Sequence, residues 1–285
     1  MLNYPLLYTE HLSRRDLELL ARAGEVEESV LRARLAENPF LVDDYLAAPR
    51  LYESIFEADR ADLDPGVTPF LVFGTLVNRS LRDLRSAAYV EEWSGPGQRL
   101  PVFDVEPLRE FLDDGSRRFF LIELLASFTR VASGSVLVRT RRGYRRRRFS
   151  ELDPVRLAEV VDQLPVLERP GGYRRLGDVA LFLSGVFPDH TARNPLAPME
   201  REWLTRSAAI EASYAHGEVN ELWFLEAAGA GWYRRAVETA TSTVGSGPDV
   251  LGNIAQRFAQ ARRILNYLTD RYLYRVESGL SGPTV

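Results

Sequence analysis

The sequence contains no cysteine and no lysine, and only three of its 285 residues are histidine. Without cysteine, the chain has no disulfide, no thiolate nucleophile and no metal site with cysteine ligands. Without lysine, it cannot form the Schiff base of pyridoxal phosphate or aldolase chemistry, and it lacks the lysine of a standard phosphate-binding loop. All 36 basic residues are therefore arginine.

The familiar catalytic motifs are also absent. None of His11, His190 and His216 follows a glutamate at the Glu-x-x-His spacing of di-iron helix bundles. The sequence has no HExxH, GxSxG or GxGxxG. A site built from carboxylates stays open as an alternative, but the pattern favours a non-catalytic protein with no catalytic residues, no metal and no cofactor.

Long apolar runs are missing as well. No stretch of about 18 apolar residues is present, which predicts that the chain does not cross a membrane. The first residues lack the basic-then-apolar order of a secretion signal. With 45% apolar and 27% charged residues, the composition is that of an ordinary globular protein. We therefore expect a cytoplasmic location.

Apolar spacing predicts an all-α fold, mostly helical with about ten helices, and one inserted β-hairpin near residues 135–149. Ser13 and Asp16 form the pattern of a capping box. Pro39 indicates a kink or a break in a helical pattern over residues 26–46. Asp153 followed by Pro154 is typical of a helix start.

Further along the chain, the pattern predicts one long helix over Phe70–Trp93 and a last long helix over residues 248–276. Gly229 and Gly231 indicate a separation between two helices. We expect a helical domain over residues 1–187 that carries the hairpin, a C-terminal helical subdomain over residues 188–276, and a disordered tail over residues 277–285. The two helical parts could equally pack as one domain.

The segment from Arg139 to Arg148 contains seven arginines in ten residues. With Arg142 and Gly143 as the central turn residues, Arg139 lies opposite Arg146, and these like charges should destabilise the ribbon. Because side chains alternate along a strand, the outward face carries four of the arginines and one tyrosine, and the opposite face carries Arg145 and Arg147. The candidate binding residues are Arg139, Arg141, Arg142, Tyr144, Arg146 and Arg148.

Three interpretations of this segment stay open. Without its seven arginines the net charge falls from −4 to −11, so the hairpin could engage an acidic protein surface, either on a partner or on a second copy of the chain. A two-stranded ribbon also fits the DNA major groove, which makes nucleic acid an alternative partner. The arginines could instead be solvated or pair within the chain. We favour an interaction or adaptor protein.

A further hypothesis from a different class is a small-molecule binder or an enzyme with a pocket in the aromatic C-terminal third. Aromatic clusters of this kind line pockets, although they also fill cores. Asp189 and His190 are adjacent and could serve as an acid–base pair. The candidate pocket residues are Trp203, Tyr214, Trp223, Trp232, Asp189 and His190.

Overall fold

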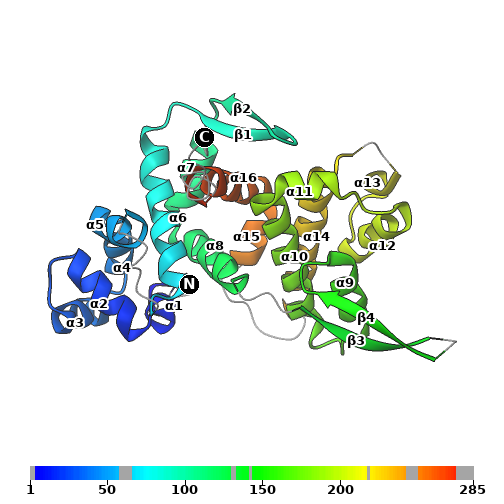
Figure 1. Cartoon of the computed structure of the whole chain (residues 1–285), viewed down its shortest axis with the longest axis horizontal. Helices are drawn as coiled ribbons and strands as arrows, with labels where there is room; N and C mark the ends of the chain where they lie inside the picture. Colours follow the sequence, from blue (N-terminus) through cyan, green and yellow to red (C-terminus); the bar gives the residue numbers. More distant parts are fainter. Residues whose placement is uncertain are drawn as a thin grey trace, which may run out of the picture. The chain divides into compact units, whose positions relative to one another are not determined.

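The computed structural model describes residues 4–57, 66–129, 133–140, 143–216, 219–241 and 250–273. These residues are mostly helical, with 16 α-helices, and they confirm the predicted all-α fold with an inserted β-hairpin (Figure 1). The chain divides into two compact units, one of residues 1–90, 101–129 and 268–285, the other of residues 91–100 and 130–267. The predicted tail, residues 277–285, lies outside the described residues.

The first unit is built around helix α6, which packs against α4, α5, α7 and α8. Leu71, Leu76 and Leu84 of α6 are fully buried and form the centre of this core. A π-helical turn, Thr269–Leu273, belongs to the same unit. The helices of the unit are α1 (Tyr4–His11), α2 (Arg14–Ala23), α3 (Glu28–Glu37), α4 (Leu41–Leu46), α5 (Pro49–Tyr52, continued by a π-helical turn over Glu53–Glu57), α6 (Pro69–Ser86), α7 (Glu106–Asp113) and α8 (Gly115–Ser127).

Two helix starts of the first unit share one carboxylate. The capping box at Ser13 and Asp16 is confirmed, since the Ser13 hydroxyl accepts from the Asp16 amide and the Asp16 carboxylate accepts from the Ser13 amide. The same carboxylate accepts from the amide and the hydroxyl of Thr68, at 3.0 and 2.8 Å. Thr68 in turn caps α6. Asp16 therefore ties the start of α2 to the start of α6.

The second unit is centred on the pair of helices α10 and α14, which share the most extensive interface among the described helices. Gly177 of α10 lies against the ring of Tyr233, whose hydroxyl donates to Asp178 at 2.9 Å. The absence of a side chain at Gly177 lets the two helices approach closely. The helices of this unit are α9 (Pro154–Gln163), α10 (Arg169–Val186), α11 (Pro188–Arg193), α12 (Pro198–Ala208), α13 (Ser213–His216), α14 (Glu221–Thr241), α15 (Val250–Gln256) and α16 (Phe258–Leu268).

The long helix predicted over Phe70–Trp93 is wrong beyond residue 86. Helix α6 ends at Ser86, and a second hairpin follows, formed by β1 (Val90–Gly95) and β2 (Gln98–Val102). Gly97 in its turn has φ = +72°, a conformation that favours glycine. The indole of Trp93 in β1 donates to Asp189 of α11 at 2.6 Å. This long-range contact holds the strand and has no counterpart in the local sequence pattern.

Two other helix boundaries differ in their outcome. The break at Pro39 is confirmed, because α3 ends at Glu37 and α4 begins at Leu41. The separation predicted at Gly229 and Gly231 is wrong, because α14 runs through both glycines. A Cβ at Gly229 would lie 2.4 Å from the Phe258 ring, so this glycine serves close packing and not chain reversal. The single long helix predicted over residues 248–276 is also wrong, because this part of the chain forms two helices, α15 and α16.

Candidate functional site

The predicted arginine hairpin is present as strands β3 (Ser133–Thr140) and β4 (Gly143–Ser150), described here by their backbone. Its register differs from the prediction. Arg139 pairs with Tyr144, and Leu137 pairs with Arg146. The predicted pairing of Arg139 with Arg146 is therefore wrong, because Gly143 pairs with Thr140 and does not occupy the centre of the turn. Arg141 and Arg142 lie outside the described residues.

The changed register removes the like-charge clash that the sequence suggested, at least for directly opposite positions. The described pairs place each strand-β4 arginine opposite a serine, valine or leucine. Direct opposition of like charges destabilises a sheet, so this register relieves a cost. Positions 139, 144, 146 and 148 still share one face of the ribbon, because residues two apart on a strand lie on the same face.

The foot of the hairpin is joined to two helices of the second unit. The amide of Asp153 donates to the Ser150 carbonyl at 3.0 Å, and the Asp153 side chain caps α9 as predicted by accepting from the amides of Val155 and Arg156. Glu151 pairs with Arg175 of α10 at 2.6 Å. These contacts attach the foot of the ribbon to α9 and α10.

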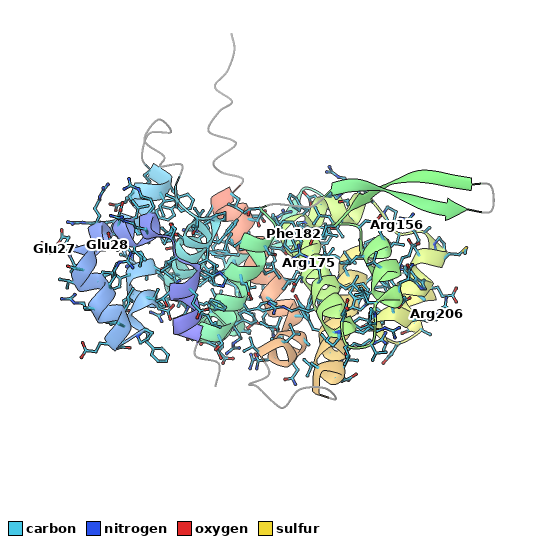
Figure 2. The ribbon with its side chains drawn as sticks, turned by 90° about the horizontal axis from the view of Figure 1, so that it is seen from below. Glu27, Glu28, Arg156, Arg175, Phe182 and Arg206 are labelled. Atoms are coloured by element: carbon cyan, nitrogen blue, oxygen red, sulfur yellow. The ribbon has the colours of Figure 1, made fainter. Side chains whose placement is uncertain are left out.

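Beyond its foot, the ribbon has little helical cover. Strands β3 and β4 pair extensively with each other, and no described helix shares an interface of comparable extent with either. Figures 1 and 2 show the ribbon running out past the helices of its own unit. The chain has no acidic residue between Glu123 and Glu151. A dense cationic segment is thus carried on a projecting strand pair.

A cavity of about 530 Å³ lies next to the hairpin foot within the second unit. It is mainly apolar, and its walls come from the end of β4, the following loop, α10, α11, the loop before α12 and α14. The residues that line it are Ser150, Leu152, Asp153, Pro154, Leu183, Phe187, His190, Thr191, Asn194, Leu196, Glu221 and Leu225.

Most polar groups of the cavity wall already have protein partners. The Thr191 hydroxyl donates to the Leu183 carbonyl at 3.0 Å, and the Asn194 amide donates to the His190 carbonyl at 2.8 Å. The Glu221 carboxylate accepts from the Leu196 amide at 2.9 Å and pairs with Arg201 at 3.3 Å. The walls therefore have a set shape, with few polar atoms left to orient a ligand.

Asp153 and Asp189, both in the second unit, have carboxyl groups in contrasting environments. Burial raises the pKa of Asp153 despite its two backbone hydrogen bonds. Burial acts in the same direction on Asp189, but the Trp93 indole, the Gly97 amide and Arg99 together bring the pKa of Asp189 below its ordinary value. Asp189 is thus an anchor for the β1–β2 hairpin.

The predicted pocket residues separate in the structure. Asp189 and His190 lie in helix α11, and of the six candidates only His190 lines the cavity. Trp232 is fully buried in the core, where its indole donates to the Ser207 hydroxyl at 3.1 Å. Trp223 is 58% exposed. Trp203 and Tyr214 are half-buried and lie outside the cavity wall.

Apart from His190, the residues of the cavity wall were not predicted as pocket residues, and the reason is physical. Leu183, Phe187 and Leu225 look like ordinary helix-face residues, because each is apolar and none belongs to a motif. Asp153 carried a local signal as well, but that signal indicated a helix cap. Contacts between separate helices bring these residues together.

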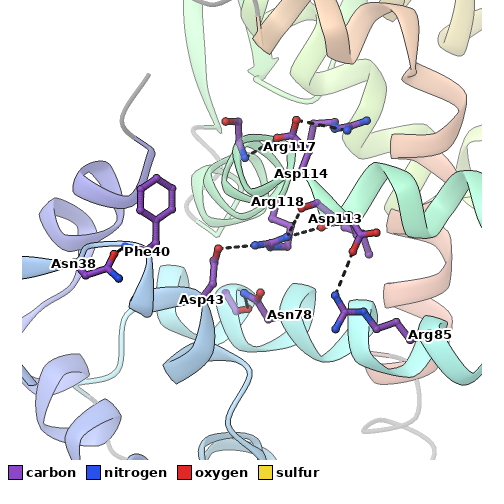
Figure 3. A network of polar contacts seen from close by, with 12 residues as sticks. Asn38, Phe40, Asp43, Asn78, Arg85, Asp113, Asp114, Arg117 and Arg118 are labelled. Atoms are coloured by element: carbon purple, nitrogen blue, oxygen red, sulfur yellow. Dashed lines mark hydrogen bonds and ion pairs between the residues drawn. The ribbon is translucent and has the colours of Figure 1, made fainter. Parts of the chain in front are cut away.

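A second charged cluster lies in the first unit and is shown in Figure 3. Arg118 of α8 is only 6% exposed, and its guanidinium pairs with Asp43 of α4 at 2.5 Å. It also donates to the carbonyls of Leu112 and Asp113 at the end of α7. A cation at a helix C-terminus interacts favourably with the exposed carbonyls. This arginine therefore joins three helices.

The surroundings of this cluster are more polar than those of the first cavity. A hollow of about 430 Å³ borders Asp43 and Arg118, and its rim includes the exposed pair of Arg85 and Asp113, 3.3 Å apart. Asn78 donates to the Gly74 carbonyl within α6 at 2.9 Å. Since these groups mainly connect helices to one another, the cluster is best explained as structural.

Comparisons with protein-family models, with curated proteins and with solved structures give no match. In the described part of the chain, no helix combines the length and the apolar character needed to cross a membrane. Nor do the described residues contain a group of three or more histidine, aspartate or glutamate side chains arranged to hold a metal ion. The hairpin and the cavity are therefore the features of this protein that bear on its function.

Proposed function

We propose that this protein is a non-catalytic interaction or adaptor protein whose arginine-rich β3–β4 hairpin binds an acidic protein surface. The observation that carries the proposal is the projecting strand pair, which is joined to α9 and α10 at its foot and has little helical cover beyond it. A ribbon of this kind can reach a partner surface without rearrangement of the helices.

The distribution of charge supports a protein partner. Taking the seven hairpin arginines from 36 leaves 29 arginines against 40 acidic residues, a net charge of −11 for the rest of the chain. Many described arginines outside the hairpin already pair with carboxylates, as Arg262 does with Glu226 at 2.6 Å and Arg201 does with Glu221. Charge segregated in this way steers association and specifies partners.

The same charge distribution argues against nucleic acid as the first choice. Arginine pairs well with phosphate, and a two-stranded ribbon fits the major groove. An acidic remainder of the chain would, however, repel the phosphate backbone, which is charged along its whole length, whereas a protein partner needs to be acidic only where the hairpin binds. Nucleic-acid binding is therefore the alternative outcome of the experiment below.

The experiment compares two variants of the full chain that remove the same number of charges. The hairpin variant replaces by serine Arg139, Arg141, Arg146 and Arg148. The control replaces by serine four arginines whose side chains are 82%, 62%, 67% and 70% exposed, namely Arg14, Arg50, Arg85 and Arg206. Both variants lose four positive charges and therefore have the same net charge. Each control arginine pairs with a carboxylate of the chain, whereas under our proposal the hairpin arginines bind a partner.

Binding to immobilised poly-L-glutamate and to a short DNA duplex is measured at low and high salt, and self-association is measured by sedimentation velocity. We expect the hairpin variant to lose about tenfold or more in affinity for polyglutamate, since an exposed ion pair contributes up to about 1 kcal/mol. The control should stay close to the wild type. Equal losses in both variants, or tighter binding to DNA than to polyglutamate, would contradict the proposal.

A further inference from the structure

The cavity beside the hairpin foot has the size and composition of a small-molecule site. Its volume of about 530 Å³ lies within the range of roughly 300–1,000 Å³ that is typical of ligand pockets. Its apolar wall is made chiefly by Leu152, Leu183, Phe187, Leu196 and Leu225. An apolar molecule would gain from leaving water for this surface.

One carboxylate oxygen of the wall stands out by its lack of close hydrogen-bond donors. Oδ1 of Asp153 accepts from the amides of Val155 and Arg156 at 3.0 and 3.1 Å. Oδ2 lies 3.9 Å from Nε of Arg156, which is too far for a hydrogen bond. Asp153 can therefore accept a hydrogen bond from a ligand without giving up its role as the cap of α9.

The charges around the cavity select the kind of ligand. Its described ionisable residues are two carboxylates, Asp153 and Glu221, and one imidazole, His190; none of them is an arginine, although the chain contains 36. Burial raises the pKa of Asp153 and makes its charged form costly, and the Arg156 guanidinium lies 3.9 Å from Oδ2, within ion-pair range but without a hydrogen bond. A ligand cation would stabilise this carboxylate, whereas a ligand carboxylate or phosphate would be repelled.

We propose that this cavity binds a small molecule with an apolar body and an amine group, and that the amine pairs with the Asp153 carboxylate. The proposal goes beyond the interaction function of the hairpin and does not depend on it. A partner can bind the arginines with the cavity empty, and an amine can occupy the cavity in a chain whose hairpin has lost its charge.

The test uses three probes of the same length and body that differ in one end group: 3-phenylpropylamine, 3-phenylpropan-1-ol and 3-phenylpropionate. Each is titrated into the full chain by calorimetry, and a thermal-shift measurement reports stabilisation of the folded state. We expect the amine to bind about tenfold more tightly than the carboxylate, because Asp153 would attract the amine and repel the carboxylate, each by the small energy of a partly exposed charge pair. The alcohol should lie between them.

Two variants locate the site. Asp153→Asn keeps a residue that caps helices as well as aspartate does, so α9 should stay intact while the charge is lost. This variant should bind the amine about tenfold more weakly and leave the alcohol unchanged. Leu152→Trp, in the loop between β4 and α9, should fill the cavity and weaken all three probes.

Circular dichroism confirms that each variant is folded, and the Asp153→Asn result stands by itself if Leu152→Trp fails to fold. The proposal is overturned if none of the three probes binds, if the carboxylate binds as tightly as the amine, or if Asp153→Asn keeps the preference for the amine. Undiminished binding to folded Leu152→Trp would place the probe elsewhere and would also overturn it.

Discussion

The packed first unit and the β3–β4 ribbon use arginine in opposite ways. Arg118 is buried among three helices, and its guanidinium contacts a carboxylate and two backbone carbonyls (Figure 3). Five of the seven arginines of the 139–148 segment lie on strands β3 and β4, which pair chiefly with each other in a stretch of chain without acidic residues. A buried cation is fixed by the groups that compensate it, whereas a cation on a projecting ribbon can be compensated by another molecule.

Removal of the buried arginine should give the largest effect. Arg118→Ala deprives Asp43 of its guanidinium partner and the end of α7 of two hydrogen bonds. Breaking a buried ion pair from one side costs about 3–5 kcal/mol, so urea denaturation should show a loss of stability of that order. The four-arginine hairpin variant should instead change stability by about 0.5 kcal/mol or less per residue, because the strands of the ribbon pair chiefly with each other and not with the helical core. A loss below about 1 kcal/mol for Arg118→Ala would show that the cluster is not structural.

Two glycines of α10 sharpen the comparison inside the unit that carries the ribbon. A Cβ at Gly177 would lie 2.3 Å from the buried ring of Tyr233, whereas a Cβ at Gly171 would meet no atom within 4 Å. Gly177→Ala should lose about 1–3 kcal/mol through overpacking, which outweighs the gain in helix propensity. Gly171→Ala should gain up to about 1 kcal/mol. Thermal denaturation measures both, and a stabilised Gly177→Ala would mean that α10 and α14 separate readily.

The smallest effects concern two carboxylates whose pKa values shift in opposite directions. The pKa of Asp189 is lowered in the folded protein. Ionised Asp189 therefore stabilises the fold at pH values above about 4, the ordinary pKa of an aspartate, and this stabilisation is lost as the pH falls through the lowered pKa. The pKa of Asp153 is raised, so folding is favoured while Asp153 keeps its proton, and this advantage is lost as the pH rises through the raised value.

The corresponding asparagine variants should therefore respond to pH with opposite signs. Relative to the wild type, Asp189→Asn should become less stable as the pH rises from about 3 to about 7, and Asp153→Asn should become more stable. Urea denaturation measures this across the pH range. Comparing each variant with the wild type at the same pH gives the contribution of the one replaced carboxyl group to the free energy of unfolding. Differences of the same sign in both variants would contradict the environments described for them.

Local features of the fold were predictable because they depend on residues close together in the chain. The capping box at Ser13 and Asp16, the break at Pro39 and the cap at Asp153 are all confirmed. The existence of the arginine hairpin was predictable from its β-branched strand and its glycine. Its register was not, because a shift of the turn by one residue moves every cross-strand partner by two.

The chain by itself determined which chemistries are excluded, where many helices begin or break, and that one segment concentrates seven arginines. These properties follow from which residues are present and from interactions between residues a few positions apart in the chain. Only the tertiary structure decided that Trp93 meets Asp189 across 96 positions and that Arg118 meets Asp43 across 75. It also formed the cavity at Asp153. Such contacts depend on how whole helices pack, and hydrophobic spacing along the chain carries no information about which distant side chain will lie opposite.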